Sequence, residues 1–238
     1  MYKISYVEKQ GEYHKYYDIP CQDKVAYVKG DDFACVALAD GAGSKRFSHI
    51  GAELTVKVIC DYFTKNDTLN VEKLFAQIEE KLRNCDYVFE DLASTLLFVY
   101  VNKDKAIIGH LGDGMIIDVI NNYAEVLSYP ENGENKNITY FTTDSNAKEK
   151  FVEKVMSLKD IDNVTFLLTS DGGEALLYNS KTNTVANAVS IMADWLNTGD
   201  EEEINEALEI NIEELSKIYT SDDVSIILLQ VKKWEFFC

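Results

Sequence analysis

Short apolar runs rich in β-branched residues constrain the fold of this chain most strongly. The clearest runs cover residues 33–39, 95–101, 164–169 and 224–231. Each has the length of a strand, and several are apolar on both faces, as strands covered on both sides are. Additional strands are expected at 24–29, 105–111, 115–120 and 123–128. The Asp113-Gly114 pair between two of these runs predicts a hairpin, and Asn121-Asn122 predicts a turn that continues the meander.

Helical spacing of apolar residues appears in four segments, at 54–63, 71–82, 185–196 and 204–219. Strands and helices are therefore segregated along the chain, which favours an α+β fold over alternating βαβ units. We expect a four-layer αββα sandwich of two antiparallel sheets flanked by helices. Its 238 residues fit a single domain, residues 1–238. The polar segment 129–162 is expected to form a surface insertion or flap, with a short strand at 138–141.

The charge balance excludes several classes of partner. Lys and Arg total 23 and Asp and Glu total 41, so the formal net charge is −18. That charge argues against binding nucleic acid or an anionic membrane surface. The chain starts without an apolar signal region and lacks the run of about 18 apolar residues that a membrane helix needs. Its five cysteines have no C-x-x-C spacing, so we expect reduced thiols and a cytoplasmic protein.

Acidic residues recur at the ends of the predicted strands. The set is Asp23, Asp40, Asp113, Asp171 and Asp222. Three of the five are next to glycines, which let a backbone carbonyl approach an ion. A single Asp-Gly at a strand end is more often a simple turn. Together, however, clustered carboxylates repel one another unless a cation or a proton offsets them, and hard oxygen ligands suit Mg²⁺ or Mn²⁺.

Five short motifs carry a family resemblance. They are Cys21-Gln22-Asp23, Asp40-Gly41-Ala42-Gly43-Ser44, Gly112-Asp113-Gly114, Ser170-Asp171-Gly172 and Ser221-Asp222-Asp223. In order and spacing, this set resembles the metal-dependent protein phosphatases of the protein phosphatase 2C type, in particular a bacterial branch. The resemblance implies a sandwich of two antiparallel sheets between pairs of helices. It also implies a hydrolase that uses two Mn²⁺ or Mg²⁺ ions, with a third ion as an option.

The resemblance further implies a role for each acidic residue. Asp40 would bridge two ions, with the carbonyl of Gly41 on one of them. Asp171 and Asp222 would complete the other ion's protein ligands. Asp113 would hold the third ion together with Asp171.

Asp23 would orient metal-bound water, and this water would attack the phosphate monoester. The chain also departs from the family pattern. Gln22 stands where better-known members are commonly acidic, and Ala42 where eukaryotic members carry a histidine proposed as general acid. Asp223 stands where an asparagine is frequent, and an upstream arginine that binds phosphate is missing.

Three residues are candidates to hold the phosphate instead. Lys45 and Arg46 form a basic pair shortly after Asp40, and arginine offers bidentate geometry to phosphate. His14 lies in the segment that supplies phosphate contacts in the resembled family. The alternative for Lys45 and Arg46 is a solvated charge pair on a loop, and the alternative for His14 is an exposed loop histidine. His110, three residues before Asp113, is expected to be a packed core histidine.

The leading hypothesis is a serine/threonine phosphoprotein phosphatase that acts on phosphorylated proteins and works with a cognate serine/threonine kinase. One alternative is a non-catalytic regulatory or phosphoprotein-binding module on the same fold, suggested by Gln22 and Ala42. Another is a phosphatase of small molecules.

Overall fold

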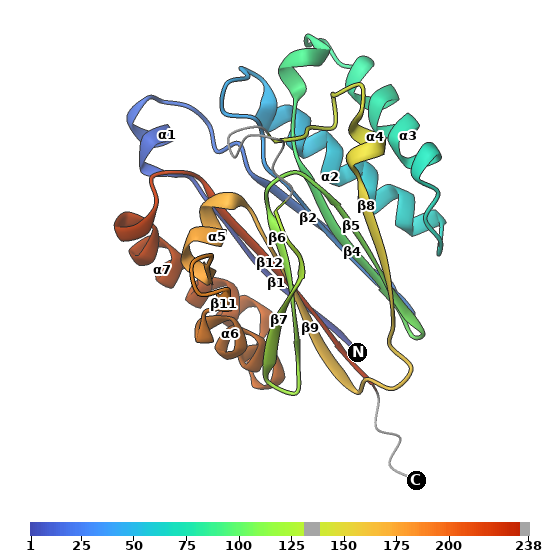
Figure 1. Cartoon of the computed structure of the whole chain (residues 1–238), viewed down its shortest axis with the longest axis vertical. Helices are drawn as coiled ribbons and strands as arrows, with labels where there is room; N and C mark the ends of the chain where they lie inside the picture. Colours follow the sequence, from blue (N-terminus) through green and yellow to red (C-terminus); the bar gives the residue numbers. More distant parts are fainter. Residues whose placement is uncertain (131–138, 234–238) are drawn as a thin grey trace.

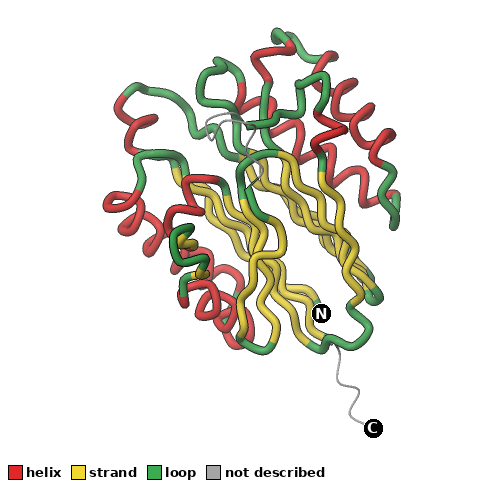
Figure 2. The backbone as a smooth tube through the Cα atoms, viewed as in Figure 1, coloured by secondary structure: helices red, strands yellow, loops and turns green. Residues whose placement is uncertain are grey.

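The apolar runs form strands of two antiparallel sheets stacked face to face, with helices on both outer faces (Figures 1 and 2). This computed structural model describes residues 1–130 and 139–233. The first sheet has the order β1 (Tyr2–Lys9), β12 (Val224–Lys232), β9 (Asn163–Thr169), β6 (Met115–Ile120) and β7 (Tyr123–Ser128). The second has the order β2 (Lys24–Lys29), β3 (Phe33–Ala39), β4 (Leu96–Asn102), β5 (Lys105–Leu111) and β8 (Val152–Ser157).

Two long helices cover each sheet, so the predicted four-layer α+β architecture is confirmed. The second sheet packs against α2 (Ser48–Lys65) and α3 (Val71–Arg83), and the first against α6 (Asn187–Thr198) and α7 (Glu201–Tyr219). The shorter elements are α1 (Glu12–Tyr16), η1 (Phe89–Leu92), α4 (Ala147–Lys150), α5 (Asp171–Leu177), β10 (Tyr178–Asn179) and β11 (Thr184–Val185). In the described residues, no helix is long and apolar enough to cross a membrane.

Strand β12 shows why the central strands are apolar on both faces. Ile226 and Leu228 pack in the core shared with α6 and α7. Ile227 and Leu229 point the other way, into the core between the two sheets. Because side chains alternate across a strand, a strand between two cores needs apolar residues at every position.

The hairpin predicted at Asp113-Gly114 is wrong. Strand β5 pairs with β4 and β8, whereas β6 pairs with β7 and β9 in the other sheet. The turn therefore carries the chain from one sheet to the other. Both strands are apolar on both faces, and tertiary packing assigned them to different sheets. The turn at Asn121-Asn122 is confirmed, with both residues at positive φ and β6 paired to β7.

The segment predicted as a surface insertion also contributes to the second sheet. Within 129–162, β8 pairs with β5 as an edge strand, and the short helix α4 precedes it. Residue 138 of the predicted strand 138–141 lies outside the described residues, and Tyr140 and Phe141 are not in a strand. The alternation in β8 is weak because an edge strand has few buried positions.

Candidate functional site

The two sheets bring the predicted aspartates together at one end of the sandwich. Asp40 follows β3, Asp113 connects β5 to β6, Asp171 follows β9, and Asp222 precedes β12. These four side chains line one cavity of about 390 Å³, which we call the acidic cavity. Asp23, just before β2, is buried beside it and only 1% exposed.

Two glycines allow the backbone to form this end of the sandwich. A Cβ on Gly172 would lie 2.1 Å from the carbonyl oxygen of Asp223, so only glycine lets the start of α5 approach the start of β12. This approach brings Asp171 close to Asp222. Gly112 has a φ of +113°, and its carbonyl oxygen lies 3.0 Å from Nε2 of His110. His110 is buried, as predicted, and fixes the turn that carries Asp113.

Hydrogen bonds from other segments hold Asp40 and Gly41. The Asp40 N–H donates to Oγ1 of Thr95 at 2.9 Å, and the Thr95 N–H donates to the Asp40 carbonyl at 2.8 Å. The Gly41 N–H donates to the Gln22 carbonyl at 3.1 Å. The hydroxyl of Thr139 donates to the Asp113 carboxylate. Thr95 and Thr139 both line the acidic cavity, and nothing in the sequence pattern had singled them out.

Three carboxyl groups of the site, those of Asp23, Asp40 and Asp171, have a raised pKa and hold protons more tightly than usual. Burial is the main cause, and it raises the pKa of Asp23 to about 7, with the charges of Asp223 and Asp171 adding to the effect. Burial and the charges of Asp23, Asp171 and Asp113 raise the pKa of Asp40 well above its usual range. Burial, followed by the charges of Asp113 and Asp222, raises the pKa of Asp171 to about 6. Without a cation, this group of carboxyls is destabilised by its own charge.

The residues present fit a hard divalent cation. Neither carboxylate oxygen of Asp23 has a hydrogen-bond partner among the described residues. Asp40, Asp113, Asp171 and Asp222, with the Gly41 carbonyl, supply oxygens of the kind that Mg²⁺ and Mn²⁺ prefer. In the described residues, no three acidic, histidine or cysteine side chains converge tightly enough to hold an ion alone. That spacing suits an ion that keeps several of its own water molecules.

Gln22 also presents an unpaired oxygen at the acidic cavity. Its Nε2 donates to Oγ of Ser48 at 2.8 Å, while its Oε1 is buried with no hydrogen-bond partner in the described part of the chain. Gln22 lines the cavity, so this unpaired oxygen lies in a residue of the cavity wall.

The three candidate phosphate ligands lie outside the cavity wall. His14 is buried in α1, with Nδ1 2.8 Å from Oδ2 of Asp223, although the angle is not that of a hydrogen bond. Lys45 and Arg46 lie on the loop after Asp40, and the Arg46 guanidinium sits 5.1 Å from the ring centroid of Phe47. The structure therefore does not bring these three side chains to the acidic cavity.

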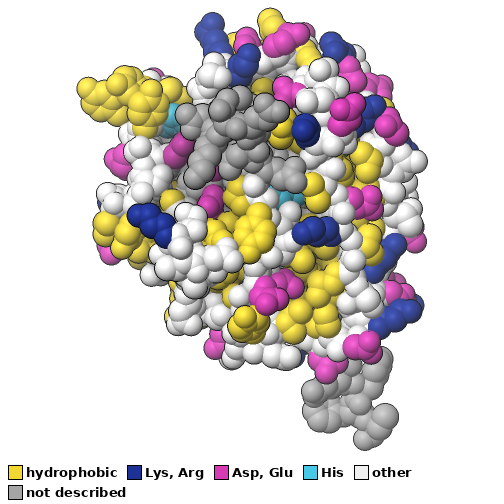
Figure 3. Space-filling view, in the orientation of Figure 1, with side chains coloured by type: hydrophobic (Ala, Val, Ile, Leu, Met, Phe, Trp, Pro, Cys, Tyr) yellow, Lys and Arg dark blue, Asp and Glu magenta, His cyan; other side chains and the backbone are white. Residues whose placement is uncertain are grey.

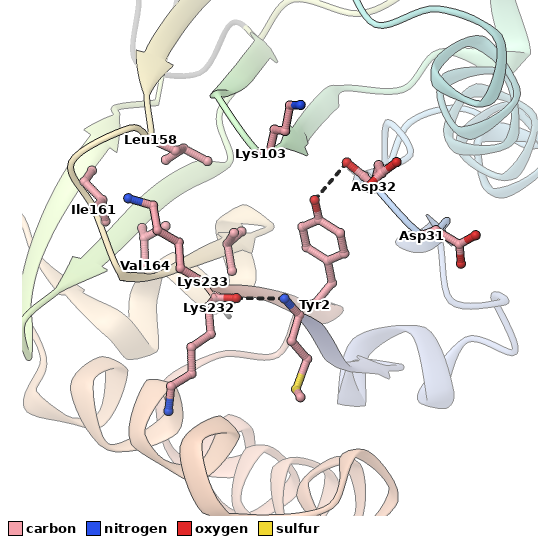
Figure 4. A pocket seen from close by; sticks show the side chains of 11 residues that line it. Tyr2, Asp31, Asp32, Lys103, Leu158, Ile161, Val164, Lys232 and Lys233 are labelled. Atoms are coloured by element: carbon pink, nitrogen blue, oxygen red, sulfur yellow. Dashed lines mark hydrogen bonds between the residues drawn. The ribbon is translucent and has the colours of Figure 1, made fainter. Parts of the chain in front are cut away.

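A second cavity, of about 320 Å³, lies at the opposite end of β12 (Figure 4). Lys103, Lys232 and Lys233 line it together with Asp31 and Asp32. Asp31 and Asp32 are exposed, so their charges are solvated rather than forced together. The buried carboxyl groups with a raised pKa lie at the acidic cavity, not at this second one.

Comparisons with known proteins identify similar phosphatases. A curated relative, serine/threonine-protein phosphatase 3 of Escherichia coli (strain K12), is 28% identical over 167 residues. That match covers 61% of this chain and 64% of the relative, so the chain spans less than two thirds of that protein's length.

Solved structures share the fold over nearly the whole chain. The serine/threonine phosphatase of S. agalactiae superposes with a TM-score of 0.69 at 17% identity, covering 96% of this chain and 99% of that one. The catalytic domain of the serine/threonine protein phosphatase PstP, in complex with two manganese ions, gives a TM-score of 0.65 at 14% identity, covering 98% and 100%.

The family model described as protein phosphatase 2C matches residues 10–213, which include every aspartate of the acidic cavity except Asp222. The matched region is most of the chain. This protein therefore belongs to the protein phosphatase 2C family.

Proposed function

We propose that the chain is a metal-dependent serine/threonine phosphoprotein phosphatase. The observation that carries this proposal is the convergence of Asp40, Asp113, Asp171 and Asp222 on one cavity, beside the buried and unpaired carboxylate of Asp23. Membership of the protein phosphatase 2C family supports it. The manganese ions of the PstP structure support Mn²⁺ or Mg²⁺ as the cofactor.

The roles of the residues follow from their positions. Asp40, Asp171 and Asp222, with the Gly41 carbonyl, would hold two ions, and Asp113 with Asp171 would hold a third. Such ions, when bound, polarise a phosphoryl oxygen and make water a nucleophile at neutral pH. Asp23 is buried beside Asp40 and would orient water in the cavity through its two free oxygens.

The three sequence-based candidates for phosphate binding lie outside the lining of the acidic cavity. Among the described residues that line the acidic cavity, none carries a positive charge. The ions therefore have to supply most of the attraction for the phosphoryl group. Lys45 and Arg46, on the loop next to the cavity, would contribute only by reorienting toward a bound substrate. His14 instead supports Asp223 from behind.

The class of substrate determines which enzyme must act before this one. Phosphoserine and phosphothreonine in proteins are made by phosphoryl transfer, so a serine/threonine kinase must supply the substrate. A cytoplasmic location stays a prediction, and the four cysteines in the described ranges are free thiols, which agrees with it.

The test is hydrolysis of a phosphothreonine peptide with added Mn²⁺. Asp40→Asn and Asp171→Asn should lower kcat at least about a hundredfold, as losing electrostatic stabilisation of a transition state does. Asp104→Asn is the matched control, because Asp104 is exposed at the far end of the second sheet. Equal activity in all variants would refute the proposal. Mn²⁺ binding without turnover of any phosphate ester would identify a binding module instead.

A further inference from the structure

Three tyrosines form an exposed aromatic surface on α1 and the residue that follows it, which we call the tyrosine patch. Tyr13, Tyr16 and Tyr17 are 53%, 82% and 58% exposed. The ring centroids of Tyr13 and Tyr17 are 4.7 Å apart, and those of Tyr16 and Tyr17 are 4.9 Å apart. Figure 3 shows a protruding group of hydrophobic side chains in this region, at the upper left. Large contiguous apolar surfaces of this kind commonly mark a binding site.

Contacts with Ser221 and Asp223, the chain neighbours of Asp222, fix the position of the tyrosine patch. A five-residue helix is too short to be stable alone, so α1 depends on tertiary contacts. The Gly11 N–H donates to Oδ1 of Asp223 at 2.7 Å, and the Tyr13 N–H donates to the Ser221 carbonyl at 3.0 Å. His14 lies against the same Asp223 carboxylate. The patch is thus anchored to residues on both sides of Asp222, which lines the cavity.

The charges around the tyrosine patch select the kind of partner. Glu12 and Lys15 on the same helix pair at 2.7 Å, so their charges offset each other. Asp18 is exposed next to the patch and leaves it with a net negative charge. Tyrosine faces attract Lys and Arg side chains, and exposed carboxylates add to that attraction. The surroundings therefore favour a basic polypeptide segment.

We propose that the tyrosine patch binds basic residues that flank the phosphorylated residue of a protein substrate. This inference rests on the proposed phosphatase function. A polypeptide whose phosphate occupies the acidic cavity passes the wall formed by Asp222 and the start of β12. Since α1 is bound to that wall, Lys or Arg side chains a few residues from the phosphate can stack on the tyrosines. The patch then sets which phosphoproteins are hydrolysed, without taking part in the chemistry.

The test compares three substrates and three variants. The substrates are an Arg-flanked phosphothreonine peptide, the same peptide flanked by Glu, and p-nitrophenyl phosphate. The variants are Tyr16→Ala, the triple change of Tyr13, Tyr16 and Tyr17 to Ala, and Tyr123→Ala as control. Tyr123 is a matched control because it is 68% exposed on β7, away from α1.

The wild-type protein should prefer the Arg-flanked peptide over the Glu-flanked one. In the triple variant, kcat/KM for the Arg-flanked peptide should fall about tenfold, mainly through KM, as expected for losing two or three exposed cation–π contacts. Tyr16→Ala should give a fall of about threefold and decides the question if the triple variant does not fold. Hydrolysis of p-nitrophenyl phosphate should be unchanged in every variant, and Tyr123→Ala should behave as wild type.

Each contrary outcome has one meaning. If the variants keep the wild-type preference for the Arg-flanked peptide, the inference is overturned. It is also overturned if the patch variants only convert a dimer to a monomer, because the occupant is then a second copy of the chain. If the wild-type protein hydrolyses none of the three substrates with Mn²⁺, the proposed function itself fails.

Discussion

In protein depleted of divalent cations, the free energy of unfolding should fall as the pH rises from about 4 to about 7. One group responsible is Asp23, whose pKa burial raises from 3.8 to about 7 in the folded protein, and the raised pKa of Asp40 acts in the same direction. Between these two values the folded state holds a proton that the unfolded state has released. The contribution of Asp23 to folding stability is therefore fully present below about pH 4. It is lost progressively as the pH rises through the folded-state pKa.

The size of the effect follows from the shift. One pKa unit corresponds to about 1.4 kcal/mol, so Asp23 alone accounts for about 4 kcal/mol across this range. For a chain of this length, that free energy corresponds to a fall in Tm of about 10 °C. Asp171, with a pKa raised to about 6, is close enough to couple with Asp23, so the two contributions are not additive.

The assay is thermal unfolding, followed by circular dichroism, of protein depleted of metal with a chelator. Wild type and Asp23→Asn should be compared across this pH range, with and without Mn²⁺. The wild-type Tm should fall as the pH rises, and the fall should be smaller in Asp23→Asn, in which Asp40 and Asp171 still titrate. Saturating Mn²⁺ should restore the wild-type Tm at neutral pH, because a bound cation offsets the carboxylate charge. The reasoning is refuted if wild type and Asp23→Asn show the same pH dependence without metal.

Two further substitutions test how the backbone positions the acidic cavity. Gly172→Ala should destabilise the protein by about 2–4 kcal/mol, because the new Cβ would lie 2.1 Å from the Asp223 carbonyl oxygen; the midpoint of urea unfolding measures this. Gly43→Ala is its control, since the nearest atom is 3.8 Å away, and a similar loss there would contradict the explanation. His110→Phe should cost about 1–3 kcal/mol, because it leaves the Gly112 carbonyl without its buried partner; an unchanged urea midpoint would exclude that role.

The sequence predicted the layers of the fold better than its connections. Strands such as β12 are apolar on both faces because each face meets a different core, and this pattern is visible without a structure. The route from β5 to β6 was mispredicted because a local turn motif does not specify which sheet receives the next strand. Strand β1 was missed because it is an edge strand with mixed composition, in which Ser5 is buried beside Ile4.

The site, like the fold, was predictable where the signal is local in the sequence and unpredictable where it depends on tertiary contacts. The aspartates at strand ends could be predicted, because strand ends and glycines mark where several loops meet. Their supporting residues could not, since Thr95 and Thr139 come from separate segments that only the tertiary structure brings to the cavity. The contact of His14 could not be predicted either: it lies against Asp223, whose two carboxylate oxygens accept the N–H groups of Gly11 and Gln22. Its role as a phosphate ligand stays a prediction.

The net charge of −18 and the tyrosine patch lead to opposite salt dependences for two kinds of substrate. A strongly anionic protein repels a small phosphate ester at long range, and even two divalent ions leave it strongly anionic. Added salt screens this repulsion, so KM for p-nitrophenyl phosphate should fall as ionic strength rises. An Arg-flanked phosphopeptide is attracted by the same field and by the exposed acids near α1, so its KM should rise with salt. A KM that moves in the same direction for both substrates would show that the flanking residues do not meet the acidic surface around the cavity.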